Sequence, residues 1–448
     1  MILTLELYLR GCVSVKLDMK FVSVVGMGKL GLPLALTFAL NGFSVIGYDV
    51  DFDKIKKLKN GTFSTQEPQI QDLLDKLNST IEFHSDGRNV VEKSDITFIV
   101  VPTPSKKDGS FSWEYIKKVI KTICFYVKPK KQRHTFVITS TVSPGTMDLI
   151  KILIEKETNK KVGKEIGLCY SPELIALGSV VQNLTNPDFL FIGESDKKSG
   201  DLVESVRKKI CLNKPKIIRT NWVNAELIKL SLNAYITTKI SFANMIARIS
   251  ENIKDADSEI ILNAIGQDSR IGTKYLKGGL GFGGPCFPRD NRSLYSTIKS
   301  IGLKIDLPLR IDDFNRKQID YIYKIAMRLY QKGQTVGILG LSYKPNTDVI
   351  EESQGVLLAQ KLVENNIPLV AFDPQVKEIK IEKIRLLDSI KECIENSNVL
   401  IITTQWSQFM EIDWNKYNNK VIIDCWGIVR SFYYKNSKNK FIRLGKYV

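Results

Sequence analysis

The sequence predicts an α/β protein with two doubly wound parallel sheets and a helical domain with a long helix between them. Three observations support this fold class: apolar strands that alternate with helical patterns from Phe21, a helical stretch from Trp222 to Glu251 without Gly or Pro, and a second strand-helix alternation from Thr335. At 448 residues the chain is too long for one core. The predicted division is an N-terminal extension (1–20), a first α/β domain (21–215), a central helical domain (216–315) and a second α/β domain (316–448).

Composition is typical of soluble globular proteins. Apolar residues make up 43% and charged residues 25% of the sequence. No apolar run approaches the roughly 18 residues that a membrane span requires. The first twelve residues contain Glu6 and lack a basic segment, so they match a secretory signal poorly. We therefore expect a cytoplasmic protein that does not engage a membrane.

The net charge of +17 raises the question of nucleic-acid binding, since basic surfaces attract phosphate backbones. Lys and Arg are, however, spread along the whole chain and form no dense basic arm. A lysine-rich solvated surface is therefore the favoured interpretation, with no nucleic-acid partner. The same positive field attracts a small anionic substrate.

Cysteine and histidine usage narrows the chemistry. The seven cysteines (12, 124, 169, 211, 286, 393 and 425) include no CxxC pair and accompany no histidine tract. Neither a disulfide framework nor a metal site is therefore expected. With only His84 and His134 in the chain, we expect Lys, Asp, Glu or Cys to carry the proton chemistry.

The first α/β domain opens as a Rossmann-like, dinucleotide-binding unit. An apolar strand, Phe21–Val25, leads into a GxGxxG turn and a helix, and a second strand ends on Asp49, about 20 residues after the glycines. The glycines let a pyrophosphate approach the helix N-terminus. Asp49 accepts hydrogen bonds from ribose hydroxyls, which favours NAD over NADP. The predicted cofactor contacts in this region are Gly26, Met27, Gly28, Leu30, Gly31, Asp49 and Lys54.

Two later strands of this domain end in small polar residues. One runs into Pro102-Thr103-Pro104, and another runs into Thr141. Because ligands of open α/β sheets lie at the carboxyl ends of the strands, Thr103 and Thr141 are candidate cofactor contacts. The alternative for each is ordinary turn chemistry.

A glycine-rich segment precedes Cys286. Five glycines lie between 278 and 284, and such a loop needs a reason to stay ordered, for which close approach of its backbone to a ligand is the first candidate. Pro288 suits the first turn of a following helix, so the Cys286 thiol is expected beside a helix N-terminus, where thiolate is favoured. Asp290 is then a nearby proton carrier. The alternative is a glycine turn followed by an ordinary buried cysteine.

Glu173 and Lys229 are further candidates. Glu173 follows a strand end, and by itself it is also compatible with a solvated loop. Lys229 and Asn233 lie at i and i+4 on an otherwise apolar helix, and a lysine on a buried face is costly unless it is paired. The alternative is a lysine at the edge of the apolar stripe with its amine in water.

The α/β pattern that restarts at Thr335 repeats the architecture of the first domain without its GxGxxG turn. Strands end at Asp373, at Thr404 and at Asp424. This repetition predicts a second Rossmann-like domain with a nucleotide-type crevice.

Taken together, the sequence resembles the UDP-glucose/GDP-mannose dehydrogenase family, NAD-dependent enzymes that oxidise the C6 hydroxyl of a nucleotide sugar to a carboxylate. The resemblance runs from about Phe21 to near the C-terminus. Besides the glycine fingerprint, it rests on Thr141, Ser171-Pro172-Glu173, Lys229 with Asn233, Arg270-Ile271-Gly272, Gly281 to Gly284 with Cys286 and Asp290, and Leu341-Ser342-Tyr343-Lys344.

The resemblance implies two hydride transfers to NAD with a thiohemiacetal and a thioester on Cys286 between them. It implies that Lys229 and Asn233 stabilise the oxyanion, that Asp290 and Thr141 organise water, and that Glu173 serves in thioester hydrolysis. Substrate contacts are implied for Glu173, Lys229, Asn233, Arg270, Lys277, Gly283 and Lys344, with Arg270 reaching the site from a neighbouring subunit. Family members dimerise through the long central helix, so the resemblance implies a homodimer or a higher homo-oligomer.

The sequence also departs from the family pattern. Leu177 stands where many members carry a second acid, Glu351 where an Arg is usual, and Arg289 where a Lys is common. These departures bear on the substrate and on cofactor affinity more than on the reaction class.

Several functions remain open from sequence alone. UDP-glucose is the leading candidate substrate, followed by a UDP-N-acetylhexosamine (GlcNAc or ManNAc) or GDP-mannose. A simple two-electron β-hydroxyacid dehydrogenase is an alternative enzyme, which Cys286 and the third domain disfavour. A catalytically silent nucleotide-sugar sensor is the alternative from another class.

Overall fold

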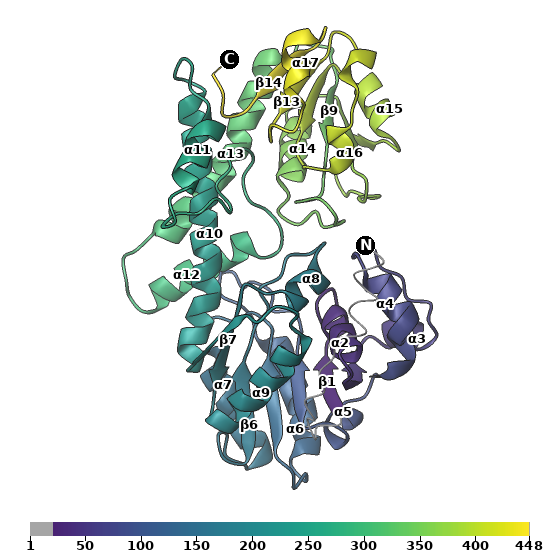
Figure 1. Ribbon diagram of the computed structural model, residues 1–448, viewed down its shortest axis with the longest axis vertical. Coiled ribbons are helices and arrows are strands. Elements are labelled where there is room, and N and C mark those ends of the chain that lie inside the picture. The colour runs from purple at the N-terminus through teal and green to yellow at the C-terminus, as the bar shows by residue number, and fades with distance from the viewer. Residues whose placement is uncertain (1–20, 448) are drawn as a thin grey trace. The chain divides into compact units, whose positions relative to one another are not determined.

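The computed structural model describes residues 21–447, so the predicted N-terminal extension and Cys12 lie outside the described part of the chain (Figure 1). The described chain divides into two compact units. The first comprises residues 21–107 and 111–229, and the second comprises residues 108–110 and 230–447. Each unit is built on one sheet.

The sheet of the first unit has eight strands in the order β3-β2-β1-β4-β5-β6-β7-β8. All neighbouring pairs are parallel except β6 with β7. The first six positions have the strand order of a dinucleotide-binding domain. In this order the chain first adds strands on one side of β1 and then, from β4 on, adds them on the other side. The strands are β1 (Phe21–Val25), β2 (Ser44–Tyr48), β3 (Ile81–His84), β4 (Ile96–Ile99), β5 (His134–Ile138), β6 (Ile166–Tyr170), β7 (Phe189–Glu194) and β8 (Lys216–Thr220).

Helices cover both faces of this sheet. Residues of α2, α3, α4, α8 and α9 share one hydrophobic cluster, and residues of α5, α6 and α7 share the other. The fold is therefore doubly wound, as predicted. The helices are α2 (Gly31–Leu40), α3 (Phe52–Lys59), α4 (Ile70–Leu77), the 3₁₀ turn η1 (Asn78–Thr80), α5 (Arg88–Glu92), α6 (Glu114–Val127), α7 (Thr146–Thr158), α8 (Val180–Thr185) and α9 (Lys197–Ile210).

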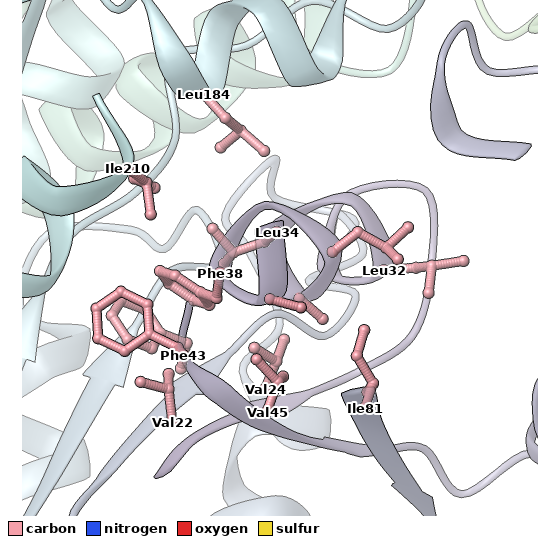
Figure 2. Close-up of a cluster of buried hydrophobic side chains, with 14 of the residues drawn as sticks. Val22, Val24, Leu32, Leu34, Phe38, Phe43, Val45, Ile81, Leu184 and Ile210 are labelled. Carbon is pink, nitrogen blue, oxygen red and sulfur yellow. The ribbon is translucent and has the colours of Figure 1, made fainter. Parts of the chain in front are cut away.

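Helix α2 is apolar on all sides because it is enclosed on all sides. Its sequence GLPLALTFAL is buried from Gly31 to Ala39. Figure 2 shows Phe38 between the strands and the other helices, with Val24 and Val45 on the sheet side and Leu184 approaching from α8. This burial holds the glycine turn at the N-terminus of α2 against the end of β1.

The long helix predicted from Trp222 to Glu251 is α10 (Trp222–Ser250), one continuous helix of 29 residues (Figure 1). The division between the two units falls within it, after Lys229. Strand β8 at 216–220 pairs with β7, so the first sheet extends beyond the predicted boundary at residue 215.

The sheet of the second unit repeats the first topology, in the order β11-β10-β9-β12-β13-β14, and all of its pairs are parallel. Helices α13 and α14 cover one face, and α15 and α16 cover the other. The predicted second Rossmann-like sheet is thus confirmed.

Its strands are β9 (Val336–Leu339), β10 (Leu369–Phe372), β11 (Ile384–Leu386), β12 (Val399–Ile402), β13 (Val421–Asp424) and β14 (Lys440–Arg443). The remaining helices of this unit are α11 (Ser258–Gly266), α12 (Phe287–Ser300), α13 (Leu307–Leu329), α14 (Gln354–Glu364), α15 (Ile390–Glu395), α16 (Ser407–Met410), the 3₁₀ turn η2 (Trp414–Lys416) and α17 (Ser431–Asn436).

Between residues 21 and 447, every helix is too short or too polar to cross a membrane.

Candidate active site

The glycine turn after β1 combines two tightly packed glycines with an open one. A Cβ at Gly26 would lie 2.1 Å from the Val100 carbonyl oxygen, and one at Gly31 would lie 1.8 Å from the Gly26 oxygen. A Cβ at Gly28 would meet no atom within 4 Å. Gly26 and Gly31 are therefore required by the turn itself, whereas the open space at Gly28 is compatible with the approach of a pyrophosphate.

Asp49 is held against this turn. One carboxylate oxygen, Oδ2, accepts hydrogen bonds from the Met27 amide (2.8 Å) and from Lys54 Nζ (3.1 Å). The other, Oδ1, accepts from the Asp51 amide at 3.0 Å. An oriented carboxylate at the end of β2 suits the ribose hydroxyls of NAD and repels a 2′-phosphate, so these residues fit the predicted cofactor.

The two candidate threonines meet at the carboxyl edge of the first sheet. The hydroxyl of Thr103, after β4, donates to the Thr141 carbonyl, after β5, at 2.8 Å. The Ser140 hydroxyl accepts from the Val101 amide at 2.9 Å and donates to the Val101 carbonyl at 2.7 Å. The loops that follow β4 and β5 are thus tied together at the edge where the sheet topology predicts a ligand.

Glu226 anchors the continuation of the Thr141 loop to α10, and sequence reasoning missed it. Its carboxylate accepts from the Gly145 amide (2.7 Å) and the Met147 amide (2.9 Å) at the start of α7. Burial raises the pKa of Glu226 to about 7, although these two amides oppose the shift. Its place three residues before Lys229 on an apolar helix was the signal that could have found it.

Glu173 is buried rather than solvated, which overturns the loop alternative. Its side chain forms a two-pronged ion pair with Arg207 of α9, in which Arg207 Nη1 donates to Oε1 and Nη2 donates to Oε2 at 2.6 Å. Glu173 is 6% exposed and Arg207 is 1% exposed. No sequence motif pointed to Arg207.

Lys229 is buried with a main-chain partner. Its Nζ donates to the carbonyl oxygen of Glu173 at 3.1 Å, and the residue is 7% exposed. The alternative of a lysine at the stripe's edge with its amine in water is therefore wrong. One turn later on α10, Asn233 is also 7% exposed.

In the second unit, Cys286 is exposed at the N-cap position of α12, and Pro288 lies in the first helical turn. The alternative of a buried cysteine is thus wrong for Cys286, although it describes Cys124 and Cys393, where burial raises the thiol pKa to about 12. Asp290, 3% exposed in the same turn, accepts from Asn233 Nδ2 at 2.6 Å. The Cys286 thiol thus lies beside a helix N-terminus, as predicted.

The glycine-rich segment before Cys286 is ordered by the protein's own side chains. The Asn315 side chain accepts from the Phe282 amide (2.7 Å) and donates to the Phe282 carbonyl (2.9 Å), and Asn244 accepts from the Gly279 amide at 2.8 Å. A Cβ at Gly281 would lie 2.2 Å from Asn315 Oδ1, and one at Gly283 would lie 2.4 Å from the Glu352 oxygen. Internal packing therefore requires these glycines, which is a different reason from the predicted approach of a ligand.

The charged substrate candidates that remain in the second unit are Arg270, Lys277 and Lys344. Arg270 is exposed and pairs with Asp268 at 2.6 Å. Lys277 is exposed, and Lys344 is half-buried, with its Nζ 5.8 Å from the centre of the Tyr343 ring. Of the departures from the family pattern, Leu177 packs against the hydrophobic cluster of α2, and Glu351 is exposed.

Asp373 follows β10 as Asp49 follows β2, but Asp373 is only 2% exposed and is bonded to its own loop. Oδ2 accepts from the amides of Leu341 (2.7 Å) and Ser342 (2.9 Å) and from the indole nitrogen of Trp406 (3.2 Å). Oδ1 accepts from the Gln375 amide at 2.9 Å. Asp373 is therefore less accessible to a ribose than Asp49, whose side chain is 11% exposed.

Comparison with known families finds three domain models in order along the chain. They are the NAD binding domain (residues 20–211), the central domain (223–317) and the UDP binding domain (337–431) of the UDP-glucose/GDP-mannose dehydrogenase family.

Individual relatives agree with this assignment. The UDP-glucose 6-dehydrogenase TuaD of Bacillus subtilis is 32% identical over 403 residues, which cover 88% of this chain and 86% of that protein. The GDP-mannose 6-dehydrogenase of Pseudomonas aeruginosa is 32% identical over 429 residues, 91% of this chain and 97% of that protein. The solved UDP-glucose dehydrogenase of Pyrobaculum islandicum superposes with a TM-score of 0.89 at 28% identity, covering 98% of this chain and all of that one. The chain therefore belongs to the UDP-glucose/GDP-mannose dehydrogenase family, whose first domain binds NAD.

Proposed function

We propose that this protein oxidises UDP-glucose at C6 to UDP-glucuronate, in two NAD-dependent steps with a covalent intermediate on Cys286. The observation that carries this proposal is the exposed thiol of Cys286 at the N-terminus of α12, in the same turn as the Asn233–Asp290 pair. An accessible, anion-favouring position is what a cysteine nucleophile needs. Relatives that act on UDP-glucose support the substrate.

Each residue then has a task that its chemistry allows. When bound, NAD supplies the hydride acceptor for both oxidations, and Gly28 and Asp49 hold its pyrophosphate and ribose. Cys286 adds as thiolate to the C6 aldehyde, and the new alkoxide is stabilised by the ammonium of Lys229 with Asn233. Loss of a second hydride turns this thiohemiacetal into a thioester. Water, organised by Asp290 and Thr141, then cleaves the carbon–sulfur bond, which yields the carboxylate and restores the thiol.

Arg270, Lys277, Gly283 and Lys344 are proposed to contact the nucleotide sugar. Three of these side chains are cationic, which suits a diphosphate. The sugar itself is recognised by contacts that the residues above do not specify, so a UDP-N-acetylhexosamine or GDP-mannose remains the second candidate. The relatives include a GDP-mannose 6-dehydrogenase at the same 32% identity.

The decisive experiment counts the NADH released per sugar consumed, with excess NAD and a panel of UDP-glucose, UDP-N-acetylglucosamine, UDP-N-acetylmannosamine and GDP-mannose. We expect two NADH per UDP-glucose. Two NADH with another sugar would move the assignment to that substrate. One NADH would indicate a simple alcohol dehydrogenase, and none, despite measurable binding, a silent sensor.

We further propose that the protein dimerises through α10. Four large apolar side chains share one helical face and are exposed in the single chain: Tyr235 (62%), Phe242 (41%), Met245 (40%) and Ile249 (46%). Exposed apolar stripes of this kind mark association surfaces. Light scattering should give a dimer mass for the wild type and a monomer mass for the double variant F242E/M245E. A monomeric wild type would contradict the proposal.

A further inference from the structure

The ion pair between Arg207 and Glu173 lies beside Lys229, and Arg207 has had no role in the reaction so far. Arg207 extends from α9, Glu173 follows β6, and Lys229 lies on α10. The three residues are linked in series: Arg207 binds the side chain of Glu173, and the main-chain carbonyl of Glu173 accepts from Lys229 Nζ at 3.1 Å.

Burying this ion pair costs hydration free energy, so the pair is stable only in a well-defined geometry. Two charges that are 6% and 1% exposed have lost most of their hydration, and only good paired geometry offsets that loss. The geometry here is two-pronged, with Nη1 on Oε1 and Nη2 on Oε2. Arg207 Nε has no hydrogen-bond partner among residues 21–447, so Glu173 is the group that compensates the buried guanidinium.

The side chain and the main chain of Glu173 have different partners: the carboxylate binds Arg207, and the main-chain carbonyl binds Lys229. Both carboxylate oxygens accept hydrogen bonds from Arg207, so the carboxylate is turned toward the guanidinium. The main-chain carbonyl, by contrast, faces the ammonium that the proposed function assigns to the oxyanion. Lysine is long and flexible, so its ammonium is located only as well as its partners locate it.

We propose that Arg207 is a positioning residue: by clamping the side chain of Glu173 it fixes the Glu173 carbonyl, and through that carbonyl the ammonium of Lys229. Glu173 then acts as a structural link between Arg207 and Lys229 (a strut), rather than as the base of thioester hydrolysis. This inference rests on the proposed function and differs from the role that family resemblance implies for Glu173.

The kinetic test compares R207M and R207K with a matched control, R133M. Arg133 also makes an ion pair to a residue at α9, donating through Nη2 to Asp196 at 2.5 Å, but it does not reach Glu173 or Lys229. R207M should lower kcat roughly 100-fold with KM changed less than about threefold, as expected for a misplaced transition-state contact. R207K keeps the charge but not the paired bonds and should lose about tenfold. R133M should keep wild-type kcat. Wild-type kcat in R207M, or in R207K if R207M does not fold, would overturn the proposal.

E173Q distinguishes a strut from a base. If Glu173 is the base, E173Q forms the thioester but hydrolyses it slowly, so intact-mass measurement during turnover finds the acyl group accumulated on Cys286. If Glu173 is a strut, the slow step lies before the thioester, and E173Q, like R207M, accumulates no acyl-enzyme. Accumulation in E173Q would overturn the strut role.

A third measurement needs no turnover. Lys229 is 7% exposed, so the wild type should protect it from reductive methylation, scored by mass spectrometry of the Lys229 peptide. R207M should lose this protection, and R133M should retain it. Protection equal to wild type in folded R207M would contradict the positioning role. If the wild type oxidises no sugar, the proposed function fails, but the methylation of Lys229 still tests whether Arg207 positions that lysine.

Discussion

At the residue scale, the chemistry depends on which polar side chains are buried with a partner and which are exposed. Cys124, Cys169, Cys393 and Cys425 are buried, and burial raises their thiol pKa values. Cys286 is exposed at a helix N-terminus. His134 is buried, which lowers its pKa to about 3 and keeps its imidazole neutral, so it is unsuited to proton transfer at neutral pH.

The first prediction concerns this difference among cysteines. C286S should lower the rate of uronate formation by roughly 1000-fold or more, because a serine hydroxyl beside a helix N-terminus does not ionise as a thiol does. The measurement is steady-state NADH formation together with product analysis. C124A, which changes a buried cysteine of α6 outside the candidate residues, is the control and should retain wild-type turnover. Unchanged turnover in C286S would exclude covalent catalysis at this residue.

At the element scale, α10 carries three polar side chains that bind other parts of the chain. Glu226 binds the start of α7, Lys229 binds the Glu173 carbonyl, and Asn233 binds Asp290. Their spacing of three and four residues gives all three one helical face. A shift of the helix would therefore disturb all three contacts together.

The second prediction follows from Glu226. Its pKa is raised by burial from 4.5 in the unfolded chain to about 7 in the folded protein. Between these values only the unfolded chain loses the proton, so this residue's contribution to the free energy of unfolding is present below pH 4.5 and is lost as pH rises to about 7. The melting temperature of the wild type should thus fall more steeply over this window than that of E226Q, which does not titrate. Equal slopes would contradict the assignment.

The helices and strands were largely predictable, because the signals that specify them lie among residues that are close in sequence. Strand and helix periodicity, the GxGxxG turn and the absence of Gly and Pro from 222 to 251 are properties of neighbouring residues. The predicted end of the long helix, Glu251, differs from the observed end by one residue. The predicted boundary at 215 missed β8, since a short strand at a sheet edge carries little periodic signal.

At the scale of the whole molecule, the two sheets share one strand order but differ in the residues that the carboxyl ends of their strands present to a ligand. The first has an open glycine turn and the partly exposed Asp49, whereas the second has Asp373, which is only 2% exposed. Equal strand order therefore does not imply equal ligands, because the ligand meets loops rather than strands.

The third prediction uses this divergence. Calorimetric titration with NAD should give one site per chain. D49A should weaken NAD binding by about 10- to 100-fold, as expected for the loss of a charged hydrogen-bond acceptor. D373A should lower thermal stability, because buried amides lose their acceptor, while NAD affinity stays near wild type. A second NAD site, or equal losses of NAD affinity in both variants, would contradict the assignment of the two sheets.

By itself, the sequence determined the two Rossmann-like sheets, the long helix, the NAD-binding turn and the candidacy of Cys286, Lys229, Asn233 and Asp290, because each signal lies within a short stretch of chain. Only the tertiary structure decided which partners these residues have. Arg207 meets Glu173 across 34 residues, Glu226 meets Gly145 across 81, and Asn315 meets Phe282 across 33. Such pairs form when packed elements exclude water and leave buried polar groups to find one another, a requirement that no local pattern records.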